Sequence, residues 1–290
     1  MKSNRPKPLH LICGRPMVMH VIHALSGVQP ERTVVVVGHE AERVTRKVQE
    51  EAPAWANVSF VEQTVQRGTG DAAMVGLTAF PGDDLDDTST VVVLPGDSPL
   101  LSAASIDFLV ATHVGNGNAA TLITSELDDP TGYGRVLRAP SKHGDGRVLR
   151  IVEQRDGTPE ELAVREVNTS MYAFRRDLLG PALRRLSPDN AQGEYYLTDV
   201  IDILRRRGRQ VSAFATPDYQ ELMGINTLAE LAEAELVLLP AKGNVQEVGL
   251  KYGSFIGSVL DFMIVSFALF LVVSKLMKVA EAKFSRSGPE

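Results

Sequence analysis

Short apolar runs alternate with longer amphipathic stretches along residues 9–239. Runs rich in Val and Thr predict strands, and the stretches between them have helical patterns. The predicted strands cover residues 33–37, 58–62, 90–94, 119–124 and 211–215. The predicted helices include residues 41–51, 71–80 and 105–113. Alternation at this spacing indicates βαβ units, so we expect an α/β fold with a mostly parallel sheet covered by helices.

Two of the strands do not alternate in polarity. Residues 33–37 read TVVVV and residues 90–94 read TVVVL, which is expected for strands that are buried on both faces. Residues 134–138 and 147–152 predict a hairpin across a turn at residues 142–146. We therefore expect an antiparallel flap over the parallel sheet.

A different apolar segment lies near the C-terminus. Residues 255–273 read FIGSVLDFMIVSFALFLVV, and Asp261 is their only charged residue. A helix of this length spans roughly 28 Å, about the thickness of a bilayer core. A buried amphipathic helix is the alternative, which Asp261 favours because a charge at mid-bilayer costs on the order of 3 kcal/mol. The predicted organisation is a domain over 1–239, a junction over 240–253, and a transmembrane-type helix with a basic tail over 254–290.

The charge balance excludes a general polyanion binder. The formal net charge is -6, whereas non-specific nucleic-acid binding requires a basic face. We expect no nucleic-acid partner, and any phosphate chemistry must depend on a few local cations or a metal. Cys13 is the single cysteine, which rules out an internal disulfide and fits a reducing cytoplasm. We expect Cys13 to be a small packing residue and the main domain to be cytoplasmic.

Asp97 follows the predicted strand at residues 90–94, in the sequence Leu-Pro-Gly-Asp-Ser-Pro-Leu. This position places a carboxylate at the carboxyl edge of a parallel sheet, where open α/β folds bind ligands. The alternative is a turn in which Asp97 caps the next helix.

A glycine-containing loop follows the strand at residues 58–62. Gly68 and Gly70 would let the backbone approach a flat ligand closely, and Gln63 and Gln66 offer donors and acceptors suited to the edge of a base. The alternative is a structural loop capped by Thr69.

Further polar segments stand at residues 128–135 (DDPTGYGR) and 190–199 (NAQGEYYLTD). The second is hard to explain by packing alone. Glu153 and Asn168 suit recognition of sugar hydroxyls and an amide, although a surface Glu is usually just solvated.

In their order and spacing these segments resemble the sugar-nucleotide pyrophosphorylases. The greatest similarity is to the uridylyltransferase domain of the bacterial N-acetylglucosamine-1-phosphate enzymes, and it runs from Met1 to about Leu239. The resemblance implies a Rossmann-like nucleotidyltransferase sheet. It also implies a reaction in which the phosphate of N-acetylglucosamine-1-phosphate attacks the α-phosphorus of UTP in line and pyrophosphate leaves.

The resemblance also implies roles for individual residues. Asp97 and Asn226 would hold the Mg²⁺ cofactor, and Asp97 would serve catalysis together with Lys7, which matches a phosphate-holding lysine. The nucleotide would contact Lys7, Gln63, Gln66, Gly68 and Thr69. The N-acetylglucosamine moiety would contact Gly134, Glu153, Asn168, Tyr196 and Thr198.

The chain departs from the family pattern at its start. The family begins with a buried strand and a Leu-Ala-Ala-Gly-x-Gly-Thr-Arg-Met loop, and this sequence starts at the Met of that loop. Losing the central strand would expose two strand edges, and losing the loop would remove amides that cradle the triphosphate. We therefore expect the chain as given to be poorly active or inactive.

The C-terminal segment resembles a different family. Residues 252–268 are similar to the second transmembrane helix of the large-conductance mechanosensitive channel. The resemblance implies membrane contact through residues 255–273, and a fusion of fragments is one reading of the whole chain. Three alternatives remain open: a pyrophosphorylase for another sugar or nucleotide, a channel-like protein with a passenger domain, and a non-catalytic sugar-nucleotide-binding remnant.

Overall fold

The computed structural model describes residues 4–80, 82, 88–140, 146–216 and 218–238. The chain divides into two units at Leu239 and Pro240, and the second unit lies entirely outside the described residues. The predicted apolar helix at residues 255–273 lies there as well. Within the described residues, no helix is both long and apolar enough to cross a membrane.

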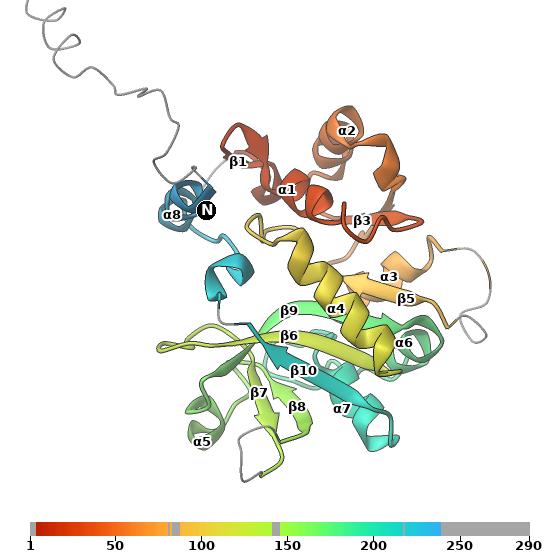
Figure 1. Cartoon of the computed structure of the whole chain (residues 1–290), viewed down its shortest axis with the longest axis vertical. Helices are drawn as coiled ribbons and strands as arrows, with labels where there is room; N and C mark the ends of the chain where they lie inside the picture. Colours follow the sequence, from red (N-terminus) through yellow and green to blue (C-terminus); the bar gives the residue numbers. More distant parts are fainter. Residues whose placement is uncertain (1–3, 81, 83–87, 141–145, 217, 239–290) are drawn as a thin grey trace, which may run out of the picture. The chain divides into compact units, whose positions relative to one another are not determined.

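The first unit alternates strands with helices (Figure 1). Its strands are β1 Leu11–Ile12, β2 Arg15–Pro16, β3 Thr33–Val37, β4 Val58–Glu62, β5 Thr90–Val93, β6 Ala120–Glu126, β7 Arg135–Arg138, β8 Val148–Val152, β9 Glu166–Arg175 and β10 Val211–Ala215. Its α-helices are α1 Met17–Ala24, α2 Ala41–Glu51, α3 Thr69–Leu77, α4 Ala103–Gly115, α5 Pro159–Leu162, α6 Arg176–Leu183, α7 Asp199–Arg206 and α8 Leu228–Leu238. Short 3-10 helices are η1 Lys7–Leu9, η2 Ala54–Ala56 and η3 Tyr219–Leu222.

The main sheet is mixed rather than mostly parallel. Its order is β10-β6-β9-β7-β8, and β5 also pairs with β9. β9 is antiparallel to β5, β6 and β7, whereas β10 is parallel to β6. β9 is not among the predicted strands, because its run EVNTSMYAFR mixes polar and apolar residues on both faces. The predicted hairpin is confirmed as β7 and β8, but it belongs to the main sheet.

Alternating side chains of β9 enter two different cores. Tyr172 and Phe174 pack with α3, α6 and α7, whereas Met171 and Ala173 pack with α4. This follows from the two-residue repeat of a strand, which sends successive side chains to opposite faces. Figure 1 shows α4 on one face of the sheet and α6 and α7 on the other. The unit is therefore a three-layer α/β/α structure.

β3 and β4 form a separate two-stranded parallel sheet. Most side chains of β3 and all of β5 are half-buried. Val91 and Val93 of β5 pack against the core that contains α3 and α6, and Val92 packs against the core that contains α4, so β5 is covered on both faces as predicted. Within the described residues, β3 and β5 each pair with only one strand.

Cys13 is exposed, which corrects its prediction as a packing residue. It occupies the tight turn between β1 and β2 with a positive φ of 47°. Its amide donates to Glu235 Oε1 at 2.9 Å, and this contact joins the turn to α8.

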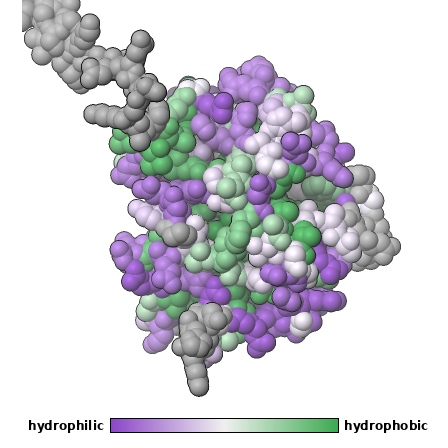
Figure 2. Space-filling view, viewed as in Figure 1, coloured by the Kyte–Doolittle hydropathy of each residue, from purple (hydrophilic) through white to green (hydrophobic). Residues whose placement is uncertain are grey.

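Figure 2 shows the molecule from the same side as Figure 1. The surface is hydrophilic over much of this face, with apolar patches that include α4 and α8.

Candidate active site

Lys7 joins two residues that the sequence assigned to one metal ion. Its Nζ donates to Asp97 Oδ2 and to Asn226 Oδ1, the latter at 2.6 Å. The Lys7 and Asp97 side chains retain 36% and 26% of their exposure, so solvent and ligands reach this ion pair. Two oxygen ligands from distant segments therefore converge on one cation.

Local structure fixes both oxygen-bearing residues. Asp97 lies four residues beyond the end of β5, and its backbone carbonyl accepts from the Ile225 amide at 2.9 Å. Asn226 directly precedes a capping box formed by Thr227 and Glu230 at the start of α8. The Glu230 carboxylate accepts from the Thr227 amide, and the Thr227 hydroxyl accepts from the Glu230 amide. The Asn226 Nδ2 donates to Gly224 O at 3.2 Å, which leaves Oδ1 directed to Lys7.

Asp97 does not cap the next helix, which was the alternative reading. α4 begins at Ala103, and its cap is Ser102, whose hydroxyl accepts from the Ser105 amide. The carboxylate of Asp97 is therefore available for another purpose at the carboxyl end of β5.

The glycine loop begins where β4 ends. Gln63 is buried, and its Nε2 donates to Gly68 O at 3.2 Å and to Asp71 Oδ2 at 2.7 Å. Gln66 is exposed, and its Nε2 donates to Gln63 O at 3.1 Å. These bonds hold the loop in a defined shape, and the exposed Gln66 remains accessible to a ligand.

Thr69 does not cap α3, contrary to the alternative reading of the loop. The cap position is Gly68, and the Thr69 hydroxyl accepts from the Leu197 amide at 3.0 Å. Gly70 N donates to Tyr195 O at 2.8 Å and Tyr195 N donates to Arg67 O at 2.7 Å. The glycine loop and the 190–199 segment, which are distant in sequence, are thus bonded side by side.

A second polar cluster contains the residues that the sequence assigned to the sugar. Thr198 Oγ1 donates to Glu153 Oε1 at 2.9 Å, and Asn168 N donates to Gly134 O at 2.8 Å. A Cβ at Gly134 would lie 3.5 Å from Glu153 Oε2, so these two positions are in contact range. Tyr196 is buried, and its hydroxyl has no hydrogen-bond partner among the described residues.

Glu153 is not a solvated surface residue, which was its alternative reading. Burial raises the pKa of its carboxyl, and the Thr198 hydroxyl opposes that shift by hydrogen bonding to the charged form. A hydrogen bond from a buried hydroxyl to a carboxylate stabilises the charged form in an apolar setting.

Sequence reasoning missed two residues that shape this cluster. Tyr172 OH donates to Asn168 Oδ1 at 2.9 Å from a fully buried position on the same strand. The buried guanidinium of Arg135 donates to Gln154 Oε1 at 2.9 Å and to Tyr133 O, so it holds the 132–135 turn. Arg135 ends the DDPTGYGR string and begins β7, and a large charged residue directly before the apolar pair Val136 and Leu137 is the signal that could have identified it.

Tyr133 connects the sugar cluster to the Lys7 site. Burial raises the pKa of Tyr133, and the negative charges of Glu230 and Asp97 raise it further. Tyr133 also lines a small pocket together with Leu222 and Met223, which lead directly into the 224–226 segment that contacts Asp97 and Lys7. The predicted site residues therefore form neighbouring clusters: Lys7 with Asp97 and Asn226, the glycine loop, and the Glu153 group.

The carboxyl of Asp199 is partly buried near Glu153, and its raised pKa predicts that the stability of the domain depends on pH. Burial, followed by the Glu153 charge, raises the pKa of Asp199 to about 6 from 3.8. The folded state therefore holds this proton more tightly than the unfolded state, and stability falls as pH rises from about 4 through about 6. We expect Asp199→Asn to raise the unfolding temperature above pH 6 and to have little effect at pH 4.

The control for this test is Asp202→Asn on the same helix. Asp202 pairs with Arg205 at 3.1 Å and with Arg206 at 2.6 Å, so its replacement should lower stability slightly at neutral pH. Calorimetric unfolding from pH 4 to pH 8 measures both variants. An Asp199→Asn difference that is independent of pH would contradict the assignment.

The layered sheet and the Lys7, Asp97 and Asn226 contacts beyond β5 define an α/β domain with a polar site beside its main sheet. The model of the nucleotidyl transferase family matches residues 2–236, and the chain belongs to this family. The match includes every candidate site residue named above.

Curated relatives share this part of the chain. Proteins named "Bifunctional protein GlmU" from Thermobifida fusca and Streptomyces avermitilis are 44% and 46% identical over 238 residues, or 82% of this chain and 48% of each relative. The Mycolicibacterium vanbaalenii protein of the same name is 46% identical over 239 residues, or 82% of this chain and 47% of its own length. The chain thus spans about half the length of the relatives it matches.

Solved structures share the fold. HddC from Yersinia pseudotuberculosis complexed with GMP-PN aligns with a TM-score of 0.57 and 18% identity, over 82% of this chain and 92% of that one. A UDP-glucose pyrophosphorylase complexed with UDP-glucose aligns with a TM-score of 0.55 and 15% identity, over 80% of this chain and 89% of that one. These similarities support the nucleotidyltransferase-type α/β fold.

The model of a second family, the large-conductance mechanosensitive channel, matches residues 210–289. Residues 239–289 of that match lie outside the described residues. The described part contains β10, η3 and α8, which belong to the first unit.

Proposed function

We propose that this domain is a UTP-dependent N-acetylglucosamine-1-phosphate uridylyltransferase, which makes UDP-N-acetylglucosamine and pyrophosphate. The observation that carries the proposal is the alignment with the GlmU proteins at 44–46% identity over the region that holds all the clustered residues. The substrates are UTP and N-acetylglucosamine-1-phosphate, as the sequence resemblance implies.

The oxygens at the Lys7 site fit a magnesium ion. Asp97 Oδ2 and Asn226 Oδ1 already share one cation, the Lys7 ammonium. The described residues contain no group of three His, Cys, Asp or Glu residues arranged for a metal, so protein would supply few ligands. Mg²⁺ commonly binds one or two carboxylates together with substrate phosphates and waters. Bound there by Asp97 and Asn226, it would neutralise charge on the nucleotide phosphates.

Lys7 supplies the positive charge that the reaction requires from the protein. An oxygen of the sugar phosphate forms a bond to the α-phosphorus of UTP, and the bond from that phosphorus to the bridging oxygen of pyrophosphate breaks. No proton transfer and no protein nucleophile are needed, so catalysis depends on positioning and on offsetting negative charge. Lys7 can exchange its protein acceptors for phosphate oxygens, because it is partly exposed on a short 3-10 helix.

The Glu153 group would orient the amino sugar. Glu153 and Asn168 present acceptors and an amide beside Gly134, where an added Cβ would lie 3.1 Å from Ile151 Cγ2, so this tightly packed position favours glycine. Thr198 and Tyr172 hold these two groups by hydrogen bonds, so the acceptors are fixed before a ligand binds. The glycine loop, with Gln63, Gln66, Gly68 and Thr69, would contact the uracil.

Substrate competition tests the proposal. We expect pyrophosphate release to require both UTP and N-acetylglucosamine-1-phosphate, with dTTP or glucose-1-phosphate reducing kcat/KM by about tenfold or more, since unpaired polar groups discriminate strongly. Equilibrium binding of UDP-N-acetylglucosamine against UDP-glucose gives the same comparison without turnover. Equal preference for another sugar or nucleotide would instead favour a different pyrophosphorylase of the family.

The channel-family match favours a separate proposal about location. Residues 255–273 would attach the chain to a membrane, while residues 1–239 remain in the cytoplasm where UTP is present. We expect the chain to sediment with membranes and to resist extraction by alkaline carbonate. Recovery of the chain in the soluble fraction would contradict this attachment.

A further inference from the structure

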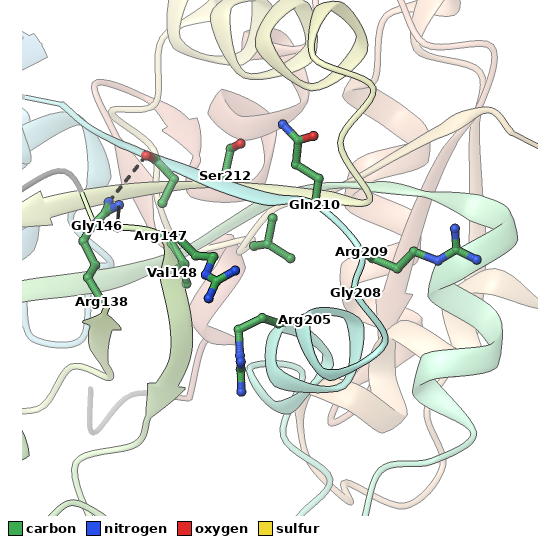
Figure 3. Close-up of a pocket in the computed structure, with 11 residues that line it drawn as sticks. Arg138, Gly146, Arg147, Val148, Arg205, Gly208, Arg209, Gln210 and Ser212 are labelled. Atoms are coloured by element: carbon green, nitrogen blue, oxygen red, sulfur yellow. Dashed lines mark hydrogen bonds between the residues drawn. The ribbon is translucent and has the colours of Figure 1, made fainter. Parts of the chain in front are cut away.

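A cavity of about 490 Å³ lies away from the Lys7 site. It is open to solvent and is lined by the end of β7, the start of β8, the end of α7 and the start of β10 (Figure 3). Val211 begins β10, whereas the segment that carries Asn226 follows the other end of this strand. The five residues of β10 span about 13 Å, so the cavity and the Lys7 site are separate places.

The lining is strongly cationic in a chain with a net charge of -6. Among the described residues that line the cavity there is no carboxylate, and the arginines are Arg138, Arg147, Arg205 and Arg209. Arg138 is paired with Glu166, and Asp202 is shared between Arg205 and Arg206. The Arg147 backbone carbonyl accepts from the Ala139 amide at 2.9 Å, whereas its guanidinium has no ion-pair or hydrogen-bond partner within the described part of the chain.

Figure 3 shows how the guanidinium groups are directed. The Arg147 side chain extends toward Arg205, whereas the Arg209 side chain points away from both. Arg205 donates Nε to Leu149 O at 2.7 Å, which ties α7 to β8 beneath this gap. The Arg205 guanidinium points away from Arg147 and is held by Leu149 and Asp202. Arg147 therefore supplies the guanidinium that can turn to a ligand, and its planar fork matches the oxygens of a phosphate group.

We propose that this cavity binds the phosphate group of a small molecule and joins β8 to α7 when occupied. The volume is in the range of small-ligand sites, and Val148, Val211 and Ala213 add an apolar wall for the body of a phosphate ester. β8 leads directly to Glu153, and α7 follows directly from Thr198. An anion held between the two elements therefore stabilises the Glu153–Thr198 contact at their other ends.

Calorimetric titration of the full chain with inorganic phosphate, at constant ionic strength set with chloride, tests the site. We expect Arg147→Gln to weaken binding about tenfold, since it removes a charge-assisted contact, and Arg147→Lys to recover part of the loss. Arg209→Gln is the matched control, because it removes the same charge from the rim without removing a group that faces the cavity. Equal weakening in Arg147→Gln and Arg209→Gln, or no weakening in either, overturns the proposal.

Two further measurements exclude the active site and identify the ligand source, and a third tests whether the ligand stabilises β8. Phosphate binding that persists in Lys7→Ala belongs to the cavity, whereas its disappearance in that variant overturns the proposal. Tighter binding of phenyl phosphate than of inorganic phosphate identifies phosphate esters as the ligand class, and equal binding identifies free phosphate. Saturating phosphate should slow amide hydrogen exchange in residues 148–152 of the parent chain but not of Arg147→Gln, a readout that does not depend on enzymatic activity.

Discussion

Under the proposed function, replacing Asp97 with Ala is expected to lower whatever rate of UDP-N-acetylglucosamine formation the chain supports by about a thousandfold, because it removes the carboxylate that would hold Mg²⁺ beside the reacting phosphates. The effect should appear in kcat more than in KM, since the cation acts where negative charge develops. Pyrophosphate release over a range of Mg²⁺ concentrations measures it. The fold should persist, because Lys7 and Asp97 are both partly exposed.

Asp128→Ala is the matched control for this substitution. The Asp128 side chain is 99% exposed and pairs with Arg165 at the surface, so its loss should leave the rate within about twofold of the parent. Asn226→Ala should raise the Mg²⁺ concentration needed for half-maximal activity. If Asp97→Ala keeps a rate within tenfold of the parent chain at every Mg²⁺ concentration, the metal assignment is wrong.

Substituting Gly68 with Ala is expected to destabilise the domain by about 3 to 5 kcal/mol and to abolish uridine nucleotide binding. Gly68 has a φ of 109°, and an added Cβ would lie 2.6 Å from Tyr195 O. Both the strained backbone and the clash with main chain must be relieved by moving the loop away from the 190–199 segment. Thermal unfolding should shift downward by about 10 °C.

Gly193→Ala separates the backbone effect from the clash. Gly193 also has a positive φ of 67°, but no atom lies within 4 Å of its ideal Cβ position. Its replacement should cost about 1 kcal/mol and preserve nucleotide binding. Equal destabilisation by the two substitutions would show that the clash between an added Cβ at position 68 and Tyr195 O contributes little to the loss of stability.

The local sequence pattern was sufficient to predict the bounds of several strands and one helix. β3, β4, β10 and α2 have the predicted bounds, because runs of β-branched residues and an amphipathic helix are visible in a short window. β9 was missed, since a strand that carries the polar residues Asn168 and Thr169 among buried positions has no clear period. The mixed sheet follows from β9, so its topology could not be predicted either.

The candidate site shows the same division. Asp97 and the glycine loop were identified because they follow apolar strands, which places them at a sheet edge by a general rule. The contacts between Lys7 and Asn226, 219 positions apart, and between Gly70 and Tyr195 depend on tertiary packing that no local pattern encodes. The family resemblance predicted that Lys7, Asp97 and Asn226 belong to one site, whereas Tyr172 and Arg135 were identified only from the structure.

The position of β9 also constrains the order in which the domain can form during synthesis. β5 and β6 are made early, but both pair with β9, whose residues 166–175 emerge about 40 to 85 positions later, as the registers of Thr90 with Arg175 and Glu126 with Glu166 show. Pairings this distant in sequence close slowly, because the loop entropy is lost before the contacts are gained. β5 and β6 therefore remain without their shared neighbour until β9 has been synthesised. A nascent chain that stalls before residue 175 has an incomplete sheet that lacks its central strand.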